Sequence, residues 1–422
     1  MKYIFLLGHQ PHLSLAELES VYNAKNIIEY NNFYAVIELN EVPNIDELGG
    51  TTKISQIIKS EYLSEDIQTQ LKNLILDFIS EQKSTKLKLG LSIYSGKNDV
   101  HLSQKNVQKI LEEVRREIKR VNPELNLRTV EPKSPILNTA QIIHSGLLKT
   151  NGISLDIIIS SPTRHPRAGQ DLIDSTVKNR VTLAQTIQVP NLRKYTLRDY
   201  SKPKPSGKNG MLPPKLAQIL INLSGAKAGD TILDPFCGSG TVLQEAILQN
   251  INCTGTDLNP NIIDDAKENL EWLENKFKIK ESGVKFKLSV ADSTSHKWSD
   301  NFDHVVCESY LGTPMTNTPT DTKLNKIIEE CNALAEEFLK NIHSQLTEES
   351  TLVYALPCWF IENKIIKLPV VENLSALGYN KVKSKKINQD GNTDLIYRRT
   401  SEDESQKRSQ IVGRDIYVLK KK

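Results

Sequence analysis

The first 60 residues alternate apolar and polar positions as a strand, a helix and a second strand would. Residues 3–7 form an apolar run too short for a signal peptide, with no small-residue cleavage site after it, and predict a first β-strand. Residues 14–22 have helical spacing, and Ser14 with Glu17 three residues later has the form of a capping box. Residues 33–39 predict the returning strand. These patterns predict a small α+β lobe over residues 1–60.

Residues 61–160 predict a second compact unit of alternating helices and strands. We expect helices at 67–80, 103–121 and 139–147, and strands at 88–94, 125–129 and 154–160. The long helix carries Arg115 and Arg116 with further basic residues on the neighbouring turns, an arrangement that can bind phosphate. Glutamates interrupt this basic run, so a solvated charged face explains it equally well.

Residues 161–208 show little apolar periodicity and many Pro, Arg and Lys residues. The basic clusters lie at 163–167, 193–195, 198–200 and 202–205, with tyrosines interleaved. Arg and Tyr together suit a surface that contacts phosphate and stacks on a base, which makes Arg198 a candidate RNA contact. A merely solvated basic linker is the alternative.

Residues 209–422 alternate strands and helices. We expect strands at 231–234, 253–257, 285–290, 304–307, 350–355, 382–387, 394–398 and 415–419, and helices at 242–249, 260–277 and 323–343, with a shorter helix after the strand at 350–355. In the helix from Pro260, apolar residues recur every three or four positions up to Phe277. Such alternation implies a parallel sheet with helices on both faces, an α/β fold.

Composition narrows the class of protein. A chain of 422 residues exceeds what one core usually supports, and 38% hydrophobic with 25% charged residues excludes wholesale disorder. No run of about 18 apolar residues suggests a transmembrane helix, so we expect a cytoplasmic protein. Five cysteines, odd in number and without C-x-x-C spacing, predict reduced buried thiols and no metal site. Because the net charge is only +3, local basic clusters would have to hold any polyanion.

The most specific motif is Thr-Ile-Leu-Asp-Pro-Phe-Cys-Gly-Ser-Gly-Thr at 231–241, a strand that runs into an acid and then a glycine turn opening a helix. Gly238 and Gly240 allow the backbone to approach a ligand at the carboxyl end of the strand. A dinucleotide fingerprint would need a third glycine where Leu243 stands. Asp234 repels phosphate but suits the cationic amino-acid end of S-adenosyl-L-methionine, which we therefore predict as the cofactor.

Acids end the next two predicted strands as well. Asp257 lies 19 residues after Gly238, at the position from which a carboxylate accepts hydrogen bonds from ribose hydroxyls. Asp292 follows the third strand and is a candidate for the adenine amino group. For Asp257, a structural capping role before Pro260 is the alternative.

The fourth strand delivers Glu308-Ser309-Tyr310-Leu311-Gly312 to the same sheet edge. Methyl transfer to an aromatic amine needs an acceptor beside the N–H, because the nitrogen lone pair is delocalised into the ring. Glu308 can be that acceptor and Tyr310 a stacking face, while in-line alignment would supply most of the rate. For Glu308, a buried acid that caps the next helix is the alternative.

Three segments resemble the THUMP-containing tRNA guanine-N2 methyltransferases. They are Gly-Met-Leu-Pro-Pro-Lys-Leu-Ala at 210–217, the motif at 234–241, and Thr-Asp-Leu-Asn-Pro at 256–260. The resemblance implies a class I Rossmann-like methyltransferase domain over 209–422 with a seven-stranded, mostly parallel sheet. It also implies cofactor contacts from Phe236, Thr241 and Leu258, in addition to Asp234, Gly238, Gly240, Asp257 and Asp292.

The resemblance extends upstream, where residues 137–159 are similar to the close of a THUMP domain. It implies a THUMP-like RNA-binding domain at 61–160, with 1–60 as its companion lobe and tRNA, near position 10, as the partner. The chain departs from the family at the catalytic loop, where Glu308-Ser309-Tyr310-Leu311-Gly312 stands for Asp-Pro-Pro-Tyr-Gly. Ser309 and Gly312 then become candidate substrate contacts, and Tyr310 a substitute for the aromatic residue one position later.

Three functions stay open on this basis. The first is an RNA methyltransferase that forms N2-methylguanosine in tRNA, acting as a monomer. The second is a methyltransferase for another RNA or DNA base amine, which predicts an N-terminal region unlike an RNA-binding module. The third, favoured by the altered loop, is a non-catalytic RNA-binding protein, which predicts no binding of S-adenosyl-L-methionine. Whether a small partner protein is needed, and whether methylation occurs once or twice, is left open.

Overall fold

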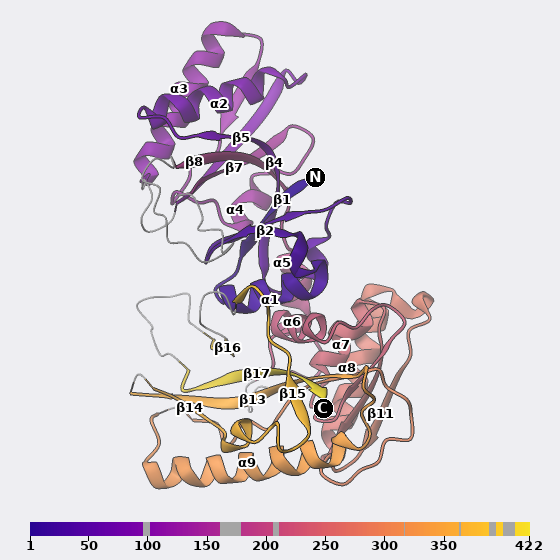
Figure 1. Cartoon of the computed structure of the whole chain (residues 1–422). Helices are drawn as coiled ribbons and strands as arrows, with labels where there is room; N and C mark the ends of the chain where they lie inside the picture. Colours follow the sequence, from indigo (N-terminus) through magenta and orange to yellow (C-terminus); the bar gives the residue numbers. More distant parts are fainter. Residues whose placement is uncertain are drawn as a thin grey trace. The chain divides into compact units, whose positions relative to one another are not determined.

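The computed structural model describes residues 1–95, 102–160, 179–205, 211–315, 317–362, 364–387, 394–399 and 410–422. These residues form two compact units. The N-terminal unit comprises Met1–Gly8, Lys25–Asp46 and Thr51–Pro190, and the C-terminal unit comprises His9–Ala24, Glu47–Gly50 and Asn191–Lys422. The chain therefore contributes two N-terminal segments to the C-terminal unit (Figure 1). No helix in the described ranges is long and apolar enough to cross a membrane.

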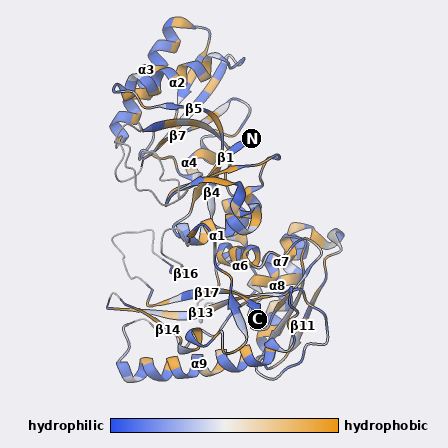
Figure 2. Cartoon of the chain, viewed as in Figure 1, coloured by the Kyte–Doolittle hydropathy of each residue, from blue (hydrophilic) through white to orange (hydrophobic). Residues whose placement is uncertain are grey.

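The N-terminal unit is built on one eight-stranded sheet with the order β2-β3-β1-β4-β8-β7-β5-β6. Its strands are β1 Lys2–Leu7, β2 Ile27–Tyr30, β3 Tyr34–Glu38, β4 Thr51–Tyr62, β5 Lys86–Ser95, β6 Asn126–Thr129, β7 Gly152–Ser160 and β8 Arg180–Gln188. Its helices are α2 Ile67–Ser80, α3 Gln104–Val121 and α4 Thr139–His144. Apolar side chains of α2 and α3 share one core with those of β5, β6, β7 and β8. Helix α3 is amphipathic, with an outward polar face (Figure 2).

The domain boundaries in the N-terminal part of the chain differ from those predicted. Strand β4 spans the boundary expected at residue 60 and pairs with β1 on one side and β8 on the other, so residues 1–60 and 61–160 share a sheet. Strand β8 lies within the predicted linker, where its buried residues Val181 and Leu183 form too short a pattern to be recognised. The basic cluster predicted at 163–167 lies outside the described residues.

The C-terminal unit contains the predicted α/β fold. Its strands are β9 Thr231–Asp234, β10 Asn252–Asp257, β11 Phe286–Val290, β12 His304–Glu308, β13 Thr351–Ile361, β14 Lys364–Lys367, β15 Tyr379–Lys381, β16 Leu395–Tyr397 and β17 Val412–Lys421. Seven of them follow the order β11-β10-β9-β12-β13-β17-β15, while β14 and β16 pair at the side. The first five are parallel and β17 runs against its neighbours, which confirms a seven-stranded, mostly parallel core.

Helices cover both faces of this sheet. The helices of the unit are α5 Leu192–Tyr200, α6 Pro214–Ser224, α7 Thr241–Leu248, α8 Pro260–Phe277 and α9 Asp321–His343, together with the N-terminal helix α1 Pro11–Tyr22. Helices α1 and α5 pack against α6. Helix α9 lies on one side of the sheet and α6 and α7 lie on the other (Figure 1). Buried residues of α9 share a core with β9, β12, β13 and β17.

Two predicted elements of this unit are wrong. The shorter helix expected after β13 is the strand β14, which pairs with the far end of β13, followed by a 3-10 turn at Pro369–Glu372. The strand expected at 382–387 is displaced to β15 at Tyr379–Lys381. The error at β15 arises because its pairing partner, β17, lies about 40 residues later in the sequence. Strand β14 instead forms a hairpin with the end of β13, where Ile361 pairs with Lys364.

Helix α1 begins at Pro11 rather than at Ser14, so Ser14 is not its N-cap. The Ser14 side chain is buried inside the helix, and its hydroxyl donates to the carbonyl oxygens of Gln10 and Gly50 at 3.1 and 2.8 Å. The helical interpretation was correct, but the capping box was not.

The neighbouring acid, Glu17, holds three parts of the C-terminal unit together. Its buried carboxylate accepts hydrogen bonds from the backbone N–H groups of Gly49 and Gly50 and from the side chain of Asn222, all at 2.8 Å. Burial raises the pKa of Glu17 to about 7, against the effect of these hydrogen bonds. Glu17 thus joins α1, the segment Glu47–Gly50 and α6.

We expect Glu17→Ala to lower the free energy of unfolding by about 1–3 kcal/mol, because two buried backbone N–H groups and an amide lose their acceptor. Urea denaturation followed by circular dichroism measures the change. Glu271→Ala, on the exposed side of α8, is the matched control and should change stability by less than about 0.5 kcal/mol. Equal stability of the two variants would contradict this role of Glu17.

Candidate active site

The carboxyl ends of β9, β10 and β12 meet at one edge of the C-terminal sheet, because the three strands are parallel neighbours. The strands end at Asp234, Asp257 and Glu308. A pocket of about 460 Å³ opens there. Its lining residues are Met211, Leu212, Asp234, Pro235, Phe236, Cys237, Gly238, Ser239, Thr241, Val242, Asp257, Leu258, Ile262, Asp265, Ala291, Asp292, Ser293, Glu308, Ser309, Tyr310, Leu311 and Leu334.

The glycine turn between β9 and α7 forms one wall. Gly238 and Gly240 have φ angles of +50° and +85°, in the left-handed region that favours glycine. The Gly238 N–H donates to Asp257 Oδ2 at 3.1 Å, and the Asn259 N–H donates to Oδ1 at 3.0 Å. Asp257 therefore fixes the turn while its carboxylate faces the pocket.

Asp234 lies at the bottom of the pocket. It is 2% exposed and accepts a hydrogen bond from the Phe236 N–H at 3.1 Å. Burial raises the pKa of Asp234, and the nearby carboxylates Asp257 and Glu308 raise it further. A cation bound here would relieve both effects.

The lining of the pocket has charge of one sign only. Five of the described lining residues are acids, namely Asp234, Asp257, Asp265, Asp292 and Glu308, and none is Lys, Arg or His. Such a site repels phosphate and attracts a cationic ligand. This arrangement fits the sulfonium and ammonium groups of S-adenosyl-L-methionine and argues against a dinucleotide.

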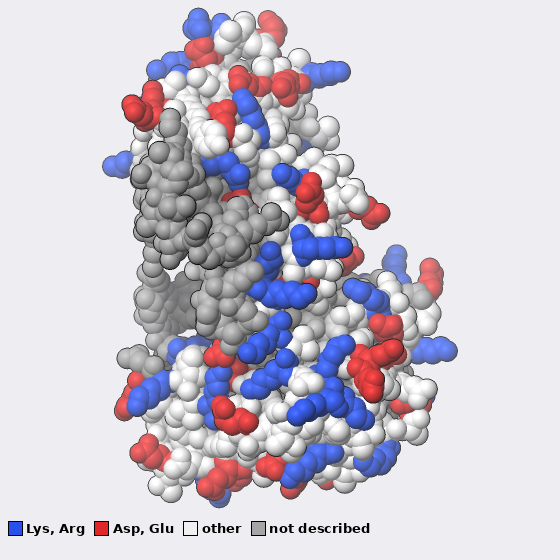
Figure 3. Space-filling view, viewed as in Figure 1, with Lys and Arg blue, Asp and Glu red and all other residues white. Residues whose placement is uncertain are grey.

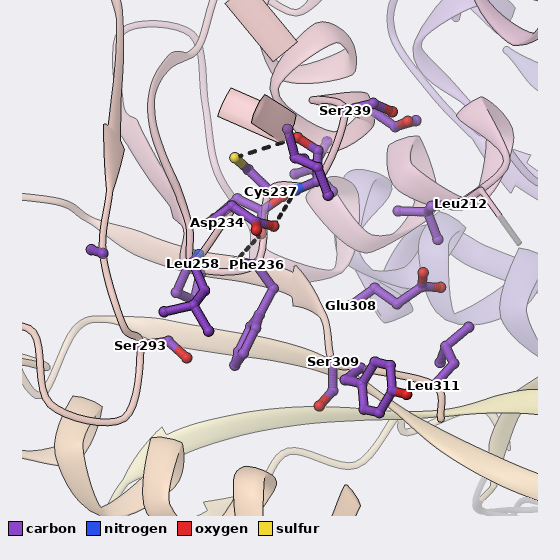
Figure 4. A pocket seen from close by; sticks show the side chains of 18 of the residues that line it. Leu212, Asp234, Phe236, Cys237, Ser239, Leu258, Ser293, Glu308, Ser309 and Leu311 are labelled. Carbon is purple, nitrogen blue, oxygen red and sulfur yellow. Dashed lines mark hydrogen bonds between the residues drawn. The ribbon is translucent and has the colours of Figure 1, made fainter. Parts of the chain in front are cut away.

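Apolar groups supply flat surfaces beside these acids. Leu258 is 70% exposed at the pocket and Tyr310 is 47% exposed. The Phe236 ring packs against Phe338 and Tyr354 with centroid separations of 5.0 and 6.3 Å. Figure 4 shows Phe236 between Asp234 and the loop that carries Ser309 and Leu311.

Glu308 lies in a buried ion pair that no local sequence pattern indicates. Its Oε1 accepts a hydrogen bond from Arg414 Nε on β17 at 2.7 Å. Burial raises the pKa of Glu308, and the Arg414 guanidinium opposes this rise. The next residue is also anchored, because the Tyr354 hydroxyl donates to Ser309 Oγ at 3.1 Å.

Asp292 is exposed at the rim of the pocket. Its Oδ1 accepts hydrogen bonds from the backbone N–H and the hydroxyl of Thr294 at 2.9 and 2.7 Å, which lower the pKa of Asp292. This leaves Asp292 anionic and oriented by Thr294.

The structure brings most of the predicted site residues to this pocket. Those that line it are Asp234, Phe236, Gly238, Thr241, Asp257, Leu258, Asp292, Glu308, Ser309 and Tyr310. Gly240 caps α7 instead of lining the pocket. Gly312, predicted as a substrate contact, does not line the pocket either. Its φ of +84° and the Ile327 side chain, 2.5 Å from where a Cβ would lie, explain the glycine.

Arg198 is not available to bind RNA, contrary to the prediction. Arg198 is 6% exposed, and its guanidinium forms a bidentate pair with Glu245, with N···O distances of 2.6 and 3.1 Å. The ring of Tyr195 lies 4.5 Å from the same guanidinium. Arg115 and Arg116 are exposed on α3, where both interpretations of that helix remain predictions.

Lys202 is a buried residue next to the pocket, and its sequence context indicates only a basic linker. It is 3% exposed, and its ammonium lies 3.5 Å from Ser239 Oγ and 3.3 Å from Thr241 Oγ1, behind the glycine turn. Burial lowers the pKa of Lys202 to about 8. The Pro-interrupted stretch 202–205 has no periodic signal from which its burial could be inferred.

Residues 202–359 match the family described as RMKL-like, methyltransferase domain. The matched segment contains the acidic pocket, both glycines of the turn and the Glu308 loop, and the match confirms the predicted methyltransferase domain.

Relatives of the methyltransferase domain support the resemblance seen in the sequence motifs. The chain is 32% identical over 149 residues to a tRNA (guanine(10)-N2)-dimethyltransferase of Methanothermobacter thermautotrophicus, covering 35% of this chain and 39% of the relative. It is 30% identical over 169 residues to the enzyme of that name from Pyrococcus abyssi, covering 40% and 44%. The match thus spans about two fifths of each relative.

The fold of the chain is similar to that of a solved structure. TrmN from Thermus thermophilus superimposes with a TM-score of 0.51 at 15% identity, and the alignment covers the whole of both chains. At this identity the likeness concerns the fold alone.

All five cysteines of the chain are buried and free, as expected. Burial raises the pKa of each thiol, including Cys237 in the pocket wall. Reduced thiols with raised pKa values are poor nucleophiles at neutral pH, so they serve packing.

We expect the stability of the protein to depend on Lys202 at alkaline pH. Between about pH 8 and 10.5 the folded chain binds fewer protons at Lys202 than the unfolded chain does, so the free energy of unfolding should rise with pH, by up to about 3 kcal/mol. Lys202→Met should remove this rise. Urea denaturation at several pH values measures it, with exposed Lys227→Met as the control that keeps it. Parallel pH curves for wild type and Lys202→Met would refute the assignment.

Proposed function

We propose that the chain transfers a methyl group from S-adenosyl-L-methionine to the exocyclic N2 amino group of a guanosine in tRNA. The observation that carries the proposal is the acidic pocket, whose described lining holds no cation, with Glu308 at its edge. Two curated relatives named tRNA (guanine(10)-N2)-dimethyltransferase support the choice of substrate.

The residues of the pocket fit the cofactor. The buried carboxylate Asp234 would neutralise the ammonium of the methionine moiety, and Asp257 would accept hydrogen bonds from the ribose hydroxyls. Leu258 and Ile262 would cover the faces of the adenine, which accounts for the exposure of Leu258. Asp292 would accept a hydrogen bond from the adenine amino group. When bound, the cofactor supplies an electrophilic methyl group.

Glu308 would act on the base to be methylated. Its carboxylate would accept a hydrogen bond from the amino N–H, which restores electron density to the nitrogen, and would take up the proton that leaves after transfer. Tyr310, exposed at the pocket, would stack on the base. Ser309 would hold the loop in place through its bond to Tyr354.

RNA binding would fall to surfaces outside the pocket. We propose a THUMP-like role for the N-terminal unit, in which Arg115 and Arg116 are exposed. On the C-terminal unit, Lys381, Lys383 and Lys385 are exposed, and Lys and Arg side chains gather over the visible face of that unit (Figure 3). Such clusters would hold an RNA backbone although the net charge is only +3.

The decisive test is transfer from methyl-labelled S-adenosyl-L-methionine to tRNA transcripts, followed by mass spectrometry of the nucleosides. We expect N2-methylguanosine, and no product from a transcript with adenosine in place of guanosine 10. Label on another base would indicate the second class of methyltransferase. Cofactor binding without transfer to any nucleic acid would contradict the proposal.

We expect Asp257→Asn to weaken cofactor binding by about 1–3 kcal/mol, roughly 5- to 150-fold in Kd, because a charged acceptor is lost and the turn at Gly238 is loosened. Isothermal calorimetry measures the affinity. Asp264→Asn, exposed on α8 and outside the pocket, is the matched control. An unchanged affinity of Asp257→Asn would exclude this acid from cofactor binding.

We expect Glu308→Gln to reduce methyl transfer by about 100-fold or more, because the amide cannot accept the leaving proton. Its affinity for the cofactor should stay within about twofold of the wild type, since Glu308 lies on the substrate side. Single-turnover kinetics and calorimetry separate the two effects. Retained turnover would remove Glu308 from the mechanism.

A further inference from the structure

Strand β17 delivers a buried arginine to the edge of the proposed active site. Arg414 lies opposite Pro357 on β13 and opposite Tyr397 on β16. Its side chain is 5% exposed, and the guanidinium lies 5.9 Å from the centroid of the Tyr397 ring. A buried guanidinium is costly unless it is paired, so the position of Arg414 calls for an explanation.

Its partner is Glu308, which is 16% exposed. The Arg414 Nε donates to Oε1 of that carboxylate at 2.7 Å. Within the described part of the chain no hydrogen bond reaches Oε2, while Glu308 itself lines the pocket. One carboxylate oxygen is therefore held by β17 and the other is available at the pocket.

The surroundings of Glu308 are otherwise unfavourable to a negative charge. Asp234 lies close enough on β9 to interact with it, as do the thiol of Cys307 on β12 and the hydroxyl of Tyr397 on β16. Burial favours the protonated form of Glu308 and raises its pKa. Among the described residues, Arg414 is the cation that opposes this effect of burial.

We propose that Arg414 is a positioning residue that fixes the Glu308 carboxylate so that its second oxygen accepts the N–H of the substrate amine. This role rests on the proposed function. It also gives the altered motif a physical basis. Two side-chain anchors, Arg414 on Glu308 and Tyr354 on Ser309, orient residues 308–312, which contain no proline to stiffen them. The predicted consequence is that Arg414 controls the pH at which the acceptor becomes competent.

The test compares methyl transfer to tRNA by the wild type, Arg414→Met and Arg414→Lys from pH 5.5 to 9. In Arg414→Met the buried Glu308 should hold its proton to higher pH, so the acid limb of the kcat profile should move up by at least about one pH unit, with kcat at pH 7 at least about tenfold lower. Arg414→Lys should return the limb towards its wild-type position. Lys420→Met, exposed near the end of the same strand, is the control and should leave the profile unchanged.

Two further measurements separate positioning from a general structural effect. Affinity for S-adenosyl-L-methionine should be unchanged in every Arg414 variant that keeps a cooperative thermal transition. The Glu308 carboxyl signal, assigned by difference from Glu308→Gln in carbon-13 spectra, should titrate at higher pH in Arg414→Met. If Arg414→Met does not fold, Arg414→Lys tests the role instead. We expect this variant to have a lower kcat and an acid limb of the kcat profile at its wild-type position.

The outcomes distinguish the two proposals. A wild type that methylates guanosine, with an Arg414→Met variant of unchanged rate and pH profile, would overturn the role of Arg414 and leave the proposed function intact. A wild type that methylates no nucleic acid would overturn the proposed function and the positioning role with it. A shifted limb together with a shifted Glu308 titration supports both.

Discussion

The C-terminal unit depends on one electrostatic arrangement, in which carboxylates from successive strand ends converge on a pocket whose described lining has no cationic side chain. Parallel pairing enforces this convergence, because β9, β10 and β12 must all end at the same edge. Repulsion between the acids opposes folding of the empty pocket, and a cationic ligand relieves it. Binding of such a ligand should therefore stabilise the folded unit as well as prepare it for chemistry.

Three buried cationic side chains lie close to this acidic pocket but are not among its described lining residues. Lys202 contacts the side chain of Thr241, Arg198 pairs with Glu245 on α7, and Arg414 on β17 pairs with Glu308. Each is nearly fully buried. The pocket keeps its negative potential, while the loops that form it are held by charged partners from outside.

The sequence was sufficient for those features that depend on local pattern. The strand at 231–234, the helix at 260–277 and the acids at the strand ends followed from apolar periodicity and a glycine motif, and parallel topology then placed Asp234, Asp257 and Glu308 together. Features that depend on partners far away in the sequence could not be predicted from local pattern. The pairing of β8 with β4 and the ion pairs of Arg198 and Arg414 join positions 47 to more than 100 residues apart. No local signal distinguishes a buried arginine from an exposed one.

Separation along the sequence also affects how helix α1 can fold. Its partner α6 is separated from it by most of the N-terminal unit, as the hydrogen bond from Ser20 to Asn222 across 202 residues shows. During synthesis on the ribosome α1 emerges early, but its apolar surface has no place to pack until α6 has been made. The C-terminal unit therefore cannot complete its fold until α6 has been synthesised. Until then, α1 stays unpacked in the nascent chain.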